Sequence, residues 1–484
     1  MIGIVSFGAY IPRLRLDRMA ICGQLGWMAP AIMAVAQGER SFCNWDEDAL
    51  TMAVAAARDC LSGVPRGSID EVFLCSTTLP FADRLNAGIL KGTLDLRDDV
   101  QAVDLTGSLR CGTTGLISAL EAVRSGDRRQ ALVAASDMRH TRAASFYEMW
   151  FGDGAASVLV GTEDVKAEFL GSFSVTHDFI DHYRGADSKF DYTWEERWVR
   201  EEGYSKIIPQ AVGGLLKKTG ISIKDVSALV FPCVFKAEYR SIAKILGANP
   251  SIVQDNLHEV CGETGSAHPL VMLSLALENA KPGEVIVVAG FGQGADALCF
   301  KATENITAPR QGLGASGYLA RRKSIDQYSK FLKFRDLIQT ESGIRAEAPI
   351  QTAMTVLWRN RRMLGGLVGG LCPVCKTPQF PMADVCVNPA CKVSGKQDDY
   401  QFADRLATVK TFTGDWLAIS PEPPSVYGLI QFDGGGRFMA DFTDCEPDDI
   451  TVGTRVTMAF RKRYTDTTRG FTGYFWKAQP AVGK

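Results

Sequence analysis

The sequence lacks three features that would point to a membrane or to nucleic acid: a large net charge, a long hydrophobic run and a low-complexity tract. Among 484 residues, 53 lysines and arginines nearly balance 55 aspartates and glutamates, which gives a formal net charge of −2. Such a chain has no whole-molecule electrostatic attraction to nucleic acid or to an anionic membrane. No apolar run reaches the roughly 18–20 residues that span a bilayer. We therefore expect neither nucleic acid nor a membrane as a partner.

Histidine is also scarce, with five in the chain, whereas cysteine is plentiful, with 13. The first residues are apolar but no basic residue precedes them, which is typical of a first strand and not of a secretory signal. An odd number of cysteines without such a signal indicates a reducing compartment. We expect a cytoplasmic protein whose cysteines serve as thiols and metal ligands and not as disulfides.

Apolar strand-like runs alternate with helical patterns up to Phe300, which favours an α/β fold with buried sheets. Three short motifs in this region occur twice, in the same order. They are a strand start, a glycine-containing helix start and a Phe-Gly turn, at 68–72 and 222–226, 111–115 and 261–265, and 151–155 and 291–295. The repeated order predicts two copies of one α/β unit, at a period far too long for a solenoid.

The pattern after Leu406 is β-like. Short apolar runs at 407–411, 426–430 and 455–460 are separated by turn clusters such as 433–436. Short strands at this spacing predict a small all-β barrel.

Two close cysteine pairs, Cys372 with Cys375 and Cys386 with Cys391, precede the predicted barrel. Four thiolates supplied by two such pairs match a closed tetrahedral zinc site. Because no ligand position is left open for water, the expected role is structural, and local folding should depend on the metal. Unligated or redox-active cysteines are the alternative.

Cys111 lies immediately before Gly112 at a predicted helix start. The positive end of the helix dipole would lower the pKa of a thiol there, and backbone N–H groups could hold a developing oxyanion. This chemistry fits a nucleophile, although a buried structural cysteine fits equally well. If the two copies pack about a pseudo-twofold axis, the equivalent turn brings His268 near Cys111 as its base, with His258 as the alternative.

The Cys111 turn, the Phe151 turn, the Gly-rich strand end at 290–294 and the segment 328–335 together resemble the thiolase superfamily. Within it, the chain is most similar to prokaryotic 3-hydroxy-3-methylglutaryl-CoA synthase-like proteins. The remainder resembles the zinc-ribbon and OB-fold protein that accompanies such enzymes as a separate subunit. The resemblance implies a duplicated thiolase-like α/β fold followed by a zinc ribbon and an OB-fold barrel. The implied parts are thiolase-like halves at 1–165 and 166–345, a linker helix and zinc ribbon at 346–400, and an OB-fold domain at 401–484.

The resemblance also implies chemistry on coenzyme A thioesters, with Cys111 acylated by an acyl-CoA. The sequence departs from the synthases at two positions. Thr77 or Thr78 stands where they carry an acid/base glutamate, and Pro232 or Cys233 stands where they carry a histidine. Conversely, His268 with the following Pro-Leu resembles the histidine stretch of true thiolases, which implies that His268 activates the nucleophile.

A second thiolase cysteine has no direct counterpart, because Val288 stands near its position; Cys261 or Cys233 could substitute. Glu263 could act as an additional acid/base beside His268, since a carboxylate in a dry pocket can have a raised pKa. It could equally serve only to cap the helix start.

These patterns predict an acyl-CoA acyltransferase that makes or cleaves a carbon–carbon bond by a Claisen- or aldol-type reaction through a cysteine acyl-enzyme. A thiolase or retro-aldol lyase on a bulky acyl-CoA is one alternative, and a non-catalytic CoA-binding scaffold is another. Family analogy implies a homodimer, with a thiolase or another acyl-CoA enzyme as a possible partner. The basic clusters at 359–362 and 461–463 could meet CoA phosphates or form solvated faces.

Overall fold

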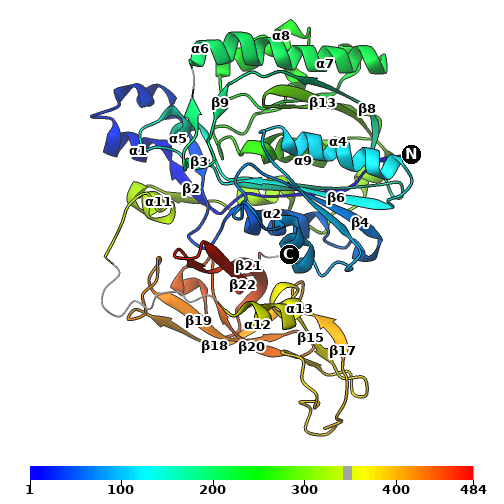
Figure 1. Cartoon of the computed structure of the whole chain (residues 1–484), viewed down its shortest axis with the longest axis vertical. Coiled ribbons are helices and arrows are strands. Elements are labelled where there is room, and N and C mark those ends of the chain that lie inside the picture. Colours follow the sequence, from blue (N-terminus) through cyan, green and yellow to red (C-terminus); the bar gives the residue numbers. More distant parts are fainter. Residues whose placement is uncertain (194, 342–351, 483–484) are drawn as a thin grey trace. The chain divides into compact units, whose positions relative to one another are not determined.

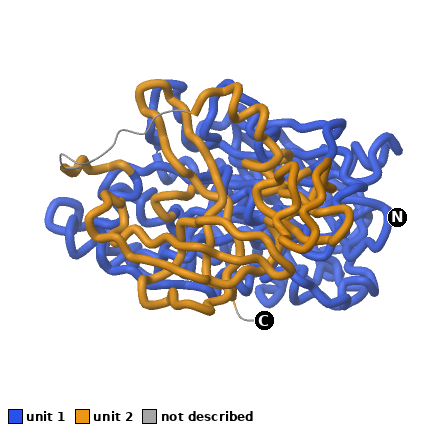
Figure 2. Tube along the Cα trace, turned by 90° about the horizontal axis from the view of Figure 1, so that it is seen from below, with its two compact units in different colours: residues 1–43, 48–90, 96–335 blue, residues 44–47, 91–95, 336–484 orange. Residues whose placement is uncertain are grey.

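The computed structural model describes residues 1–193, 195–341 and 352–482. The chain forms two compact units (Figure 2): unit 1 comprises residues 1–43, 48–90 and 96–335, and unit 2 comprises residues 44–47, 91–95 and 336–484. The predicted boundary between residues 345 and 346 lies outside the described residues.

Nine strands form the main sheet of unit 1, in the order β11-β12-β13-β8-β1-β7-β6-β4-β5. Their bounds are β1 (Gly3–Tyr10), β4 (Ile69–Cys75), β5 (Gln101–Leu105), β6 (Gln130–Asp137), β7 (Gly154–Gly161), β8 (Ala167–Thr176), β11 (Ala228–Val230), β12 (Val285–Phe291) and β13 (Gly294–Ala302). In each half, one strand runs parallel to the first strand of an antiparallel hairpin: β4 beside β6–β7, and β11 beside β12–β13. This repeated pairing confirms the predicted duplication.

Four longer helices cover the sheet: α2 (Ala49–Cys60), α4 (Cys111–Arg124), α7 (Ser205–Thr219) and α9 (His268–Asn279). Helices α4 and α9 lie between the two halves of the sheet (Figure 1), since α4 contacts both β6 and β13 and α9 contacts both β7 and β12. Helix α2 packs on β1, β6 and β7, and α7 packs on β8, β12 and β13. Among the helices of the described ranges, none combines the length and apolar character needed to cross a bilayer.

Shorter elements connect these layers. The helices are α1 (Arg18–Leu25), α3 (Asn86–Thr93), α5 (Phe146–Trp150), α6 (Glu196–Trp198), α8 (Lys236–Ile245), α10 (Gly314–Ala320) and α11 (Tyr328–Phe334). The strands are β2 (Leu14–Asp17), β3 (Glu39–Ser41), β9 (His182–Tyr183), β10 (Tyr192–Thr193) and β14 (Lys323–Ile325).

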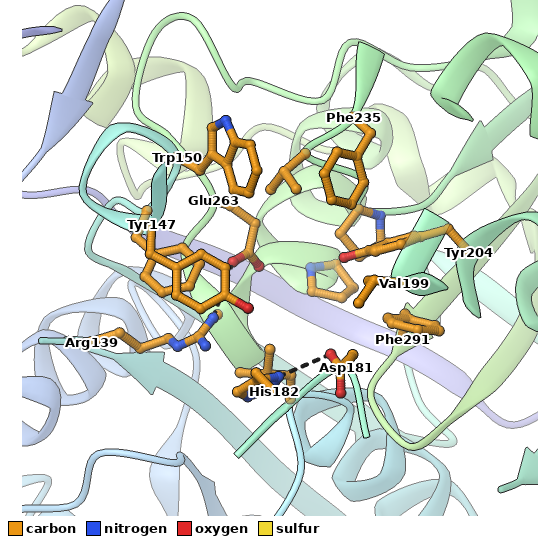
Figure 3. Close-up of a pocket in the computed structure, with 16 residues that line it drawn as sticks. Arg139, Tyr147, Trp150, Asp181, His182, Val199, Tyr204, Phe235, Glu263 and Phe291 are labelled. Carbon is orange, nitrogen blue, oxygen red and sulfur yellow. Dashed lines mark hydrogen bonds and ion pairs between the residues drawn. The ribbon is translucent and has the colours of Figure 1, made fainter. Parts of the chain in front are cut away.

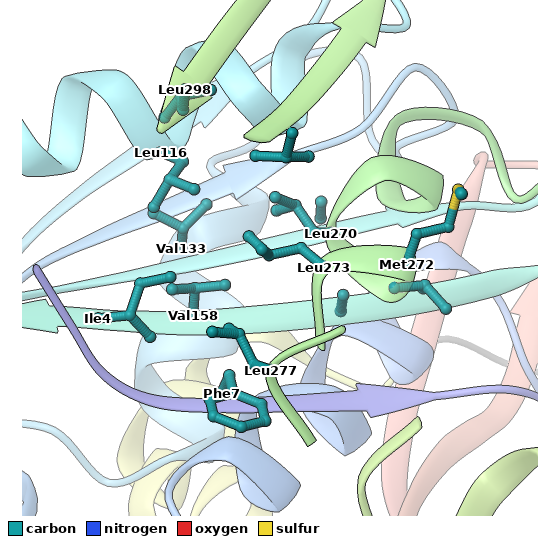
Figure 4. Packing of buried hydrophobic residues seen from close by; sticks show 14 of the residues in the cluster. Ile4, Phe7, Leu116, Val133, Val158, Leu270, Met272, Leu273, Leu277 and Leu298 are labelled. Atoms are coloured by element: carbon teal, nitrogen blue, oxygen red, sulfur yellow. The ribbon is translucent and has the colours of Figure 1, made fainter. Parts of the chain in front are cut away.

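The hydrophobic core of unit 1 is centred on α4 and α9 (Figure 4). Leu116 of α4, Leu270 and Leu273 of α9, Val133 of β6 and Leu298 of β13 belong to one buried cluster. A helix that is apolar nearly all round must be covered on every side, and the sequence HPLVMLSLALEN of α9 meets that condition between two sheet halves. The core thereby fixes the N-terminal ends of both helices, where Cys111 and His268 stand.

Unit 2 contains short helices and two sheets. Its elements are α12 (Met354–Arg359), α13 (Arg361–Gly365), β15 (Val368–Leu371), β16 (Pro378–Gln379), β17 (Asp398–Gln401), β18 (Ala407–Asp415), β19 (Ser425–Phe432), β20 (Arg437–Asp441), β21 (Arg455–Asp466) and β22 (Phe471–Pro480). The sheet orders are β16-β15-β17 and β20-β19-β18-β21-β22. The five-stranded antiparallel sheet confirms the predicted all-β module.

Two large side chains that carry polar groups, Trp476 and Arg461, are buried in the interior of unit 2. Trp476 is buried and its indole N–H donates to the carbonyl of Gly365 at 2.7 Å. Arg461 is also buried and pairs with Asp444 at 2.9 Å. The prediction that the cluster at 461–463 meets CoA phosphates or solvent is therefore wrong for Arg461, because its guanidinium already has a buried carboxylate partner.

Candidate active site

Cys111 is the first residue of α4, and its side chain is buried, with 4% of the residue exposed. The Ser266 hydroxyl and the Gly112 backbone N–H beside the sulfur favour the thiolate and act to lower the pKa of Cys111. Burial and the neighbouring Asp137 nevertheless raise the pKa of Cys111 above its usual range. The predicted lowering of this pKa is wrong, because desolvation outweighs the helix terminus. Free Cys111 is a neutral thiol at physiological pH.

The two repeated turns meet at this point. A Cβ added to Gly112 would lie 2.2 Å from the carbonyl oxygen of Ser266, so only glycine permits the backbones to approach so closely. Gly265 has a φ of +65°, and a Cβ there would collide with the Asp137 carboxylate. The start of α4 and the turn η6 (Gly265–Ala267) that leads into α9 are therefore in direct backbone contact.

His268 begins α9 and is buried. Its Nε2 lies 2.9 Å from the Asn256 carbonyl oxygen, and its Nδ1 lies 3.2 Å from the Thr264 backbone nitrogen, which donates to it. Burial lowers the pKa of His268 to about 4, so the ring is neutral at physiological pH. To serve as the base for Cys111, His268 would have to exchange one of these hydrogen bonds.

The alternative histidine, His258, is buried as well, and burial lowers its pKa to about 3. Its backbone carbonyl accepts a hydrogen bond from the Arg18 guanidinium at 2.5 Å.

Asp137, at the end of β6, is a buried carboxylate beside Cys111 that the sequence analysis did not single out. Its Oδ1 accepts hydrogen bonds from the Thr77 backbone N–H (2.7 Å) and the Thr78 hydroxyl (2.9 Å). Its Oδ2 accepts one from the Ser266 backbone N–H at 2.7 Å. The sequence signal for this residue was its place at the carboxyl end of a strand: Asp137 ends β6 and Thr77 follows β4, and the carboxyl ends of these neighbouring parallel strands share one sheet edge.

A small cavity of about 40 Å³ lies next to the Cys111 turn (Figure 3), with Leu109 and Gly265 in its lining. Six of its 16 lining residues have large aromatic side chains: Tyr147, Trp150, Phe151, Tyr204, Phe235 and Phe291. Four groups that can carry charge also face it: Arg139, Asp181, His182 and Glu263. An enclosed aromatic wall excludes water and strengthens electrostatic interactions among these four groups.

Glu263 is one of these groups. Its Oε2 lies 3.6 Å from the Arg139 guanidinium, and burial raises the pKa of Glu263 above its ordinary value. The residues directly before η6 and α9 are Thr264 and Ala267, so Glu263 is not the N-cap of either helix. The structure places its carboxyl group on the cavity wall.

His182 and Asp181 form a second polar group at the cavity, and the sequence analysis assigned neither a role. His182 Nδ1 lies 2.9 Å from Asp181 Oδ2. Asp181 ends the connection between β8 and β9, and His182 is the first residue of β9. The only local signal was the adjacency of a histidine to an aspartate, which is too common to indicate a site.

In unit 2, Cys372, Cys375, Cys386 and Cys391 bring their sulfur atoms to within 4.8 Å of one another. Cys372 Sγ is 3.9 Å from Cys391 Sγ, and Cys375 Sγ is 3.5 Å from Cys386 Sγ. Four thiols gathered this closely could bind a metal ion, as their spacing predicts.

Comparisons with known proteins agree with this architecture. The family model of the 3-oxoacyl-[acyl-carrier-protein] synthase III C terminal matches residues 216–300, and that of the ChsH2 C-terminal OB-fold domain matches residues 400–461. A hydroxymethylglutaryl-CoA synthase of Pyrobaculum aerophilum is 30% identical over 349 residues, which cover 70% of this chain and 98% of that protein. The corresponding protein of Aeropyrum pernix is 31% identical over 340 residues, which cover 69% and 94% of the two chains.

Solved structures show the same fold at lower identity. An HMG-CoA synthase complexed with CoA has a TM-score of 0.61 and 17% identity, covering 73% of this chain and 94% of its own. The 3-oxoacyl-(acyl carrier protein) synthase III of Pseudomonas aeruginosa has a TM-score of 0.55 and 21% identity, covering 62% and 98%.

The duplicated fold, with a cysteine at the start of a buried central helix, defines an acyltransferase of the thiolase superfamily. Within that class, the chain belongs to the hydroxymethylglutaryl-CoA synthase family, fused here to a C-terminal OB-fold module.

Proposed function

We propose that this protein joins two acyl-CoA thioesters through a new carbon–carbon bond, with Cys111 carrying one acyl group as a thioester. The observation that carries the proposal is the placement of Cys111: a buried thiol at the start of α4, beside an enclosed cavity, in a chain of this family. Acylation exchanges the CoA thioester for an enzyme thioester, so atoms and charge balance without another reactant.

The surroundings of Cys111 suit a thiol that is ionised only during attack. Burial keeps it neutral at rest, while the Ser266 hydroxyl and the Gly112 N–H stabilise the thiolate as it forms. We assign the accompanying proton transfer to His268, which is neutral and can accept a proton once an incoming substrate displaces one of its partners. We assign Glu263, on the cavity wall, as an additional acid/base group beside His268.

The cavity favours a short acyl group. Its volume of about 40 Å³ leaves room for a few water molecules, which suits a small group such as an acetyl unit. The name of the relatives points to a 3-hydroxy-3-methylglutaryl thioester as product. Such a product divides chemically into an acetyl unit and an acetoacetyl thioester.

We further propose three properties that would support this activity. A zinc ion bound by the four cysteines of unit 2 would hold the segment 372–391, the predicted zinc ribbon, in its fold, because four thiolates complete a tetrahedral shell. Strand β5 ends the nine-stranded sheet, and pairing of this edge with a second copy would form a homodimer. Thirteen cysteines, none of them in a disulfide, suit the reducing cytoplasm, where a thiolase or another acyl-CoA enzyme could supply the substrate.

Intact-protein mass spectrometry tests the proposal. The protein would be incubated with acetyl-CoA, propionyl-CoA or isobutyryl-CoA, beside the variants Cys111→Ala and Cys261→Ala. We expect a mass gain of one acyl group in the wild type and in Cys261→Ala, and none in Cys111→Ala. An adduct that survives in Cys111→Ala, or no adduct with any of the three thioesters, would overturn the assignment of Cys111.

A further inference from the structure

The cavity carries a histidine–aspartate pair that the assignments above do not use. His182 Nδ1 is 2.9 Å from Asp181 Oδ2, and both side chains are nearly buried, with 12% and 8% exposed. In Figure 3 the pair lies in the lower part of the view, between Arg139 and Phe291. A carboxylate at Nδ1 holds the imidazole proton there and leaves Nε2 as a proton acceptor.

The other oxygen of Asp181 gives a second indication of a ligand. Asp181 is 6% exposed, and its Oδ1 is buried without a hydrogen-bond partner among the described residues. A buried carboxylate oxygen of this kind costs free energy unless a bound molecule supplies a donor. Because Asp181 lines the cavity, that molecule would lie beside His182.

Buried ion pairs fix the position of this histidine–aspartate pair. Strand β9, which contains His182, pairs with β10, whose preceding residue is Asp191. The Asp191 carboxylate binds two guanidinium groups, Arg139 at 2.8 Å and Arg184 at 2.9 Å. Arg139 is fully enclosed and also faces Glu263 across the cavity wall. The β9–β10 hairpin is therefore anchored to the wall that holds Glu263, and His182 cannot drift from the cavity without breaking these pairs.

We propose that His182 is the acid–base catalyst of the carbon–carbon bond-forming step, with Asp181 as its positioning residue and a short acyl group on Cys111 as its substrate. This inference rests on the proposed function. It places the imidazole of the site at the start of β9, whereas Cys233 and Pro232 occupy the segment where the resemblance implies a histidine. In this assignment His268 assists acylation of Cys111, and His182 acts on the acyl group afterwards.

The proton balance of this step is complete. His182 Nε2 takes a proton from the carbon next to the thioester carbonyl of the acyl group on Cys111, and the electron pair of the broken C–H bond remains as an enolate. That carbon forms a bond to the ketone carbon of the second thioester, whose oxygen gains the negative charge. The same Nε2 then returns its proton to this oxygen, which becomes a hydroxyl group. Hydrolysis of the bond to Cys111 releases the product.

Two readouts separate acylation from the step assigned to His182. Acetyl-CoA would be incubated with the protein in D₂O, and intact mass would report acetylation while the mass of recovered acetyl-CoA would report deuterium in its methyl group. The variants are His182→Phe, which preserves an aromatic ring in an aromatic cavity, and Asp181→Asn, which preserves shape. The matched control is His177→Phe, at an exposed histidine that hydrogen-bonds Gln210 outside the cavity.

We expect the adduct to form in all four proteins. Methyl deuteration should fall by about 10²–10⁴-fold in His182→Phe, the usual contribution of a general acid–base group, by a smaller factor in Asp181→Asn, and not in His177→Phe. If an acylated His182→Phe deuterates acetyl-CoA at the wild-type rate, or if the acylated wild type does not deuterate it, the inference is overturned. Should His182→Phe lose its fold, the isosteric Asp181→Asn decides by the same criterion. No adduct in the wild type would instead refute the proposed function, and the inference with it.

Discussion

Replacing Asp137 by asparagine should change two properties in opposite directions: the unit should become less stable, and Cys111 should become more acidic. Both effects follow from one buried carboxylate whose five hydrogen-bond donors come from three strand-end residues and from Ser266. An asparagine keeps the shape of this side chain but has one acceptor oxygen instead of two. Its amide NH₂ is a donor and must therefore face one of the donors that now bind a carboxylate oxygen, and that donor loses its acceptor.

The stability loss can be bounded from these contacts. In the better of two orientations, the amide oxygen replaces Oδ1 and the NH₂ faces the backbone N–H of Ser266, which stood 2.7 Å from Oδ2. One buried N–H without an acceptor costs about 1–3 kcal/mol. The hydrogen bonds to the remaining oxygen also lose the extra strength of a charged acceptor, which roughly doubles a hydrogen bond. We expect a loss of at least about 1–3 kcal/mol in the free energy of unfolding of unit 1.

The effect on Cys111 has the opposite sign because the negative charge of Asp137 disfavours a second negative charge beside it. Removing that charge should lower the pKa of the thiol, so iodoacetamide should alkylate Cys111 at a lower pH. Ser76→Ala is the matched control, since it removes one donor at 3.0 Å and leaves the carboxylate charged. An Asp137→Asn protein with unchanged urea stability, or an alkylation profile shifted to higher pH, would refute this reasoning.

Three further predictions concern stability. Chelation of metal, or Cys375→Ser, should unfold the predicted zinc ribbon of unit 2, since apparent binding energies at structural zinc sites reach about 10–16 kcal/mol. Metal analysis would measure the bound zinc, and circular dichroism would measure the loss of structure. Arg335→Met should cost about 3–5 kcal/mol in urea unfolding, because it leaves Asp153 as an unpaired buried charge. Burial lowers the pKa of His268 to about 4, so the folded state favours the neutral imidazole. The resulting contribution to the free energy of unfolding is complete above about pH 6.5, the ordinary pKa of histidine. This contribution is lost as the pH falls towards 4, so His268→Asn should flatten that decline by up to about 1.4 kcal/mol per pH unit.

Each of these expectations has a contrary result. A protein that contains no zinc and keeps its ribbon fold would exclude a structural metal. An Arg335→Met variant as stable as the wild type would mean that Asp153 is not charged in the folded state. A decline between pH 6.5 and 5 that is equal in the wild type and in His268→Asn would show that this imidazole has the same pKa in the folded and unfolded states.

Much of the fold could be predicted because repetition and periodicity are visible in the chain. Helices α4 and α9 begin at the two glycine-containing turns that the repeat identified. The spacing of the two cysteine pairs was enough to predict that their four sulfur atoms lie close together. The apolar character of α9 follows from its place between the sheet halves, and that pattern could be read directly.

The environment of the site could not be predicted to the same degree. The pKa of Cys111 is governed by burial and by Asp137, a residue of another strand, and neither is encoded in the residues next to the cysteine. His182 reaches the cavity through a hairpin held by Asp191, so its position depends on tertiary ion pairs. His268, which the local motif favoured, has its two ring nitrogens hydrogen-bonded to Asn256 and Thr264.

The most direct test of the central claim is product formation from two thioesters. Wild type and Cys111→Ser would be given acetyl-CoA with acetoacetyl-CoA, while free thiol is titrated and the products are weighed by mass spectrometry. The account predicts that the wild type releases one CoA for each new six-carbon thioester, and that Cys111→Ser releases none. A six-carbon product formed by Cys111→Ser at the wild-type rate would contradict it, as would a wild type that is acylated yet never joins the two acyl groups.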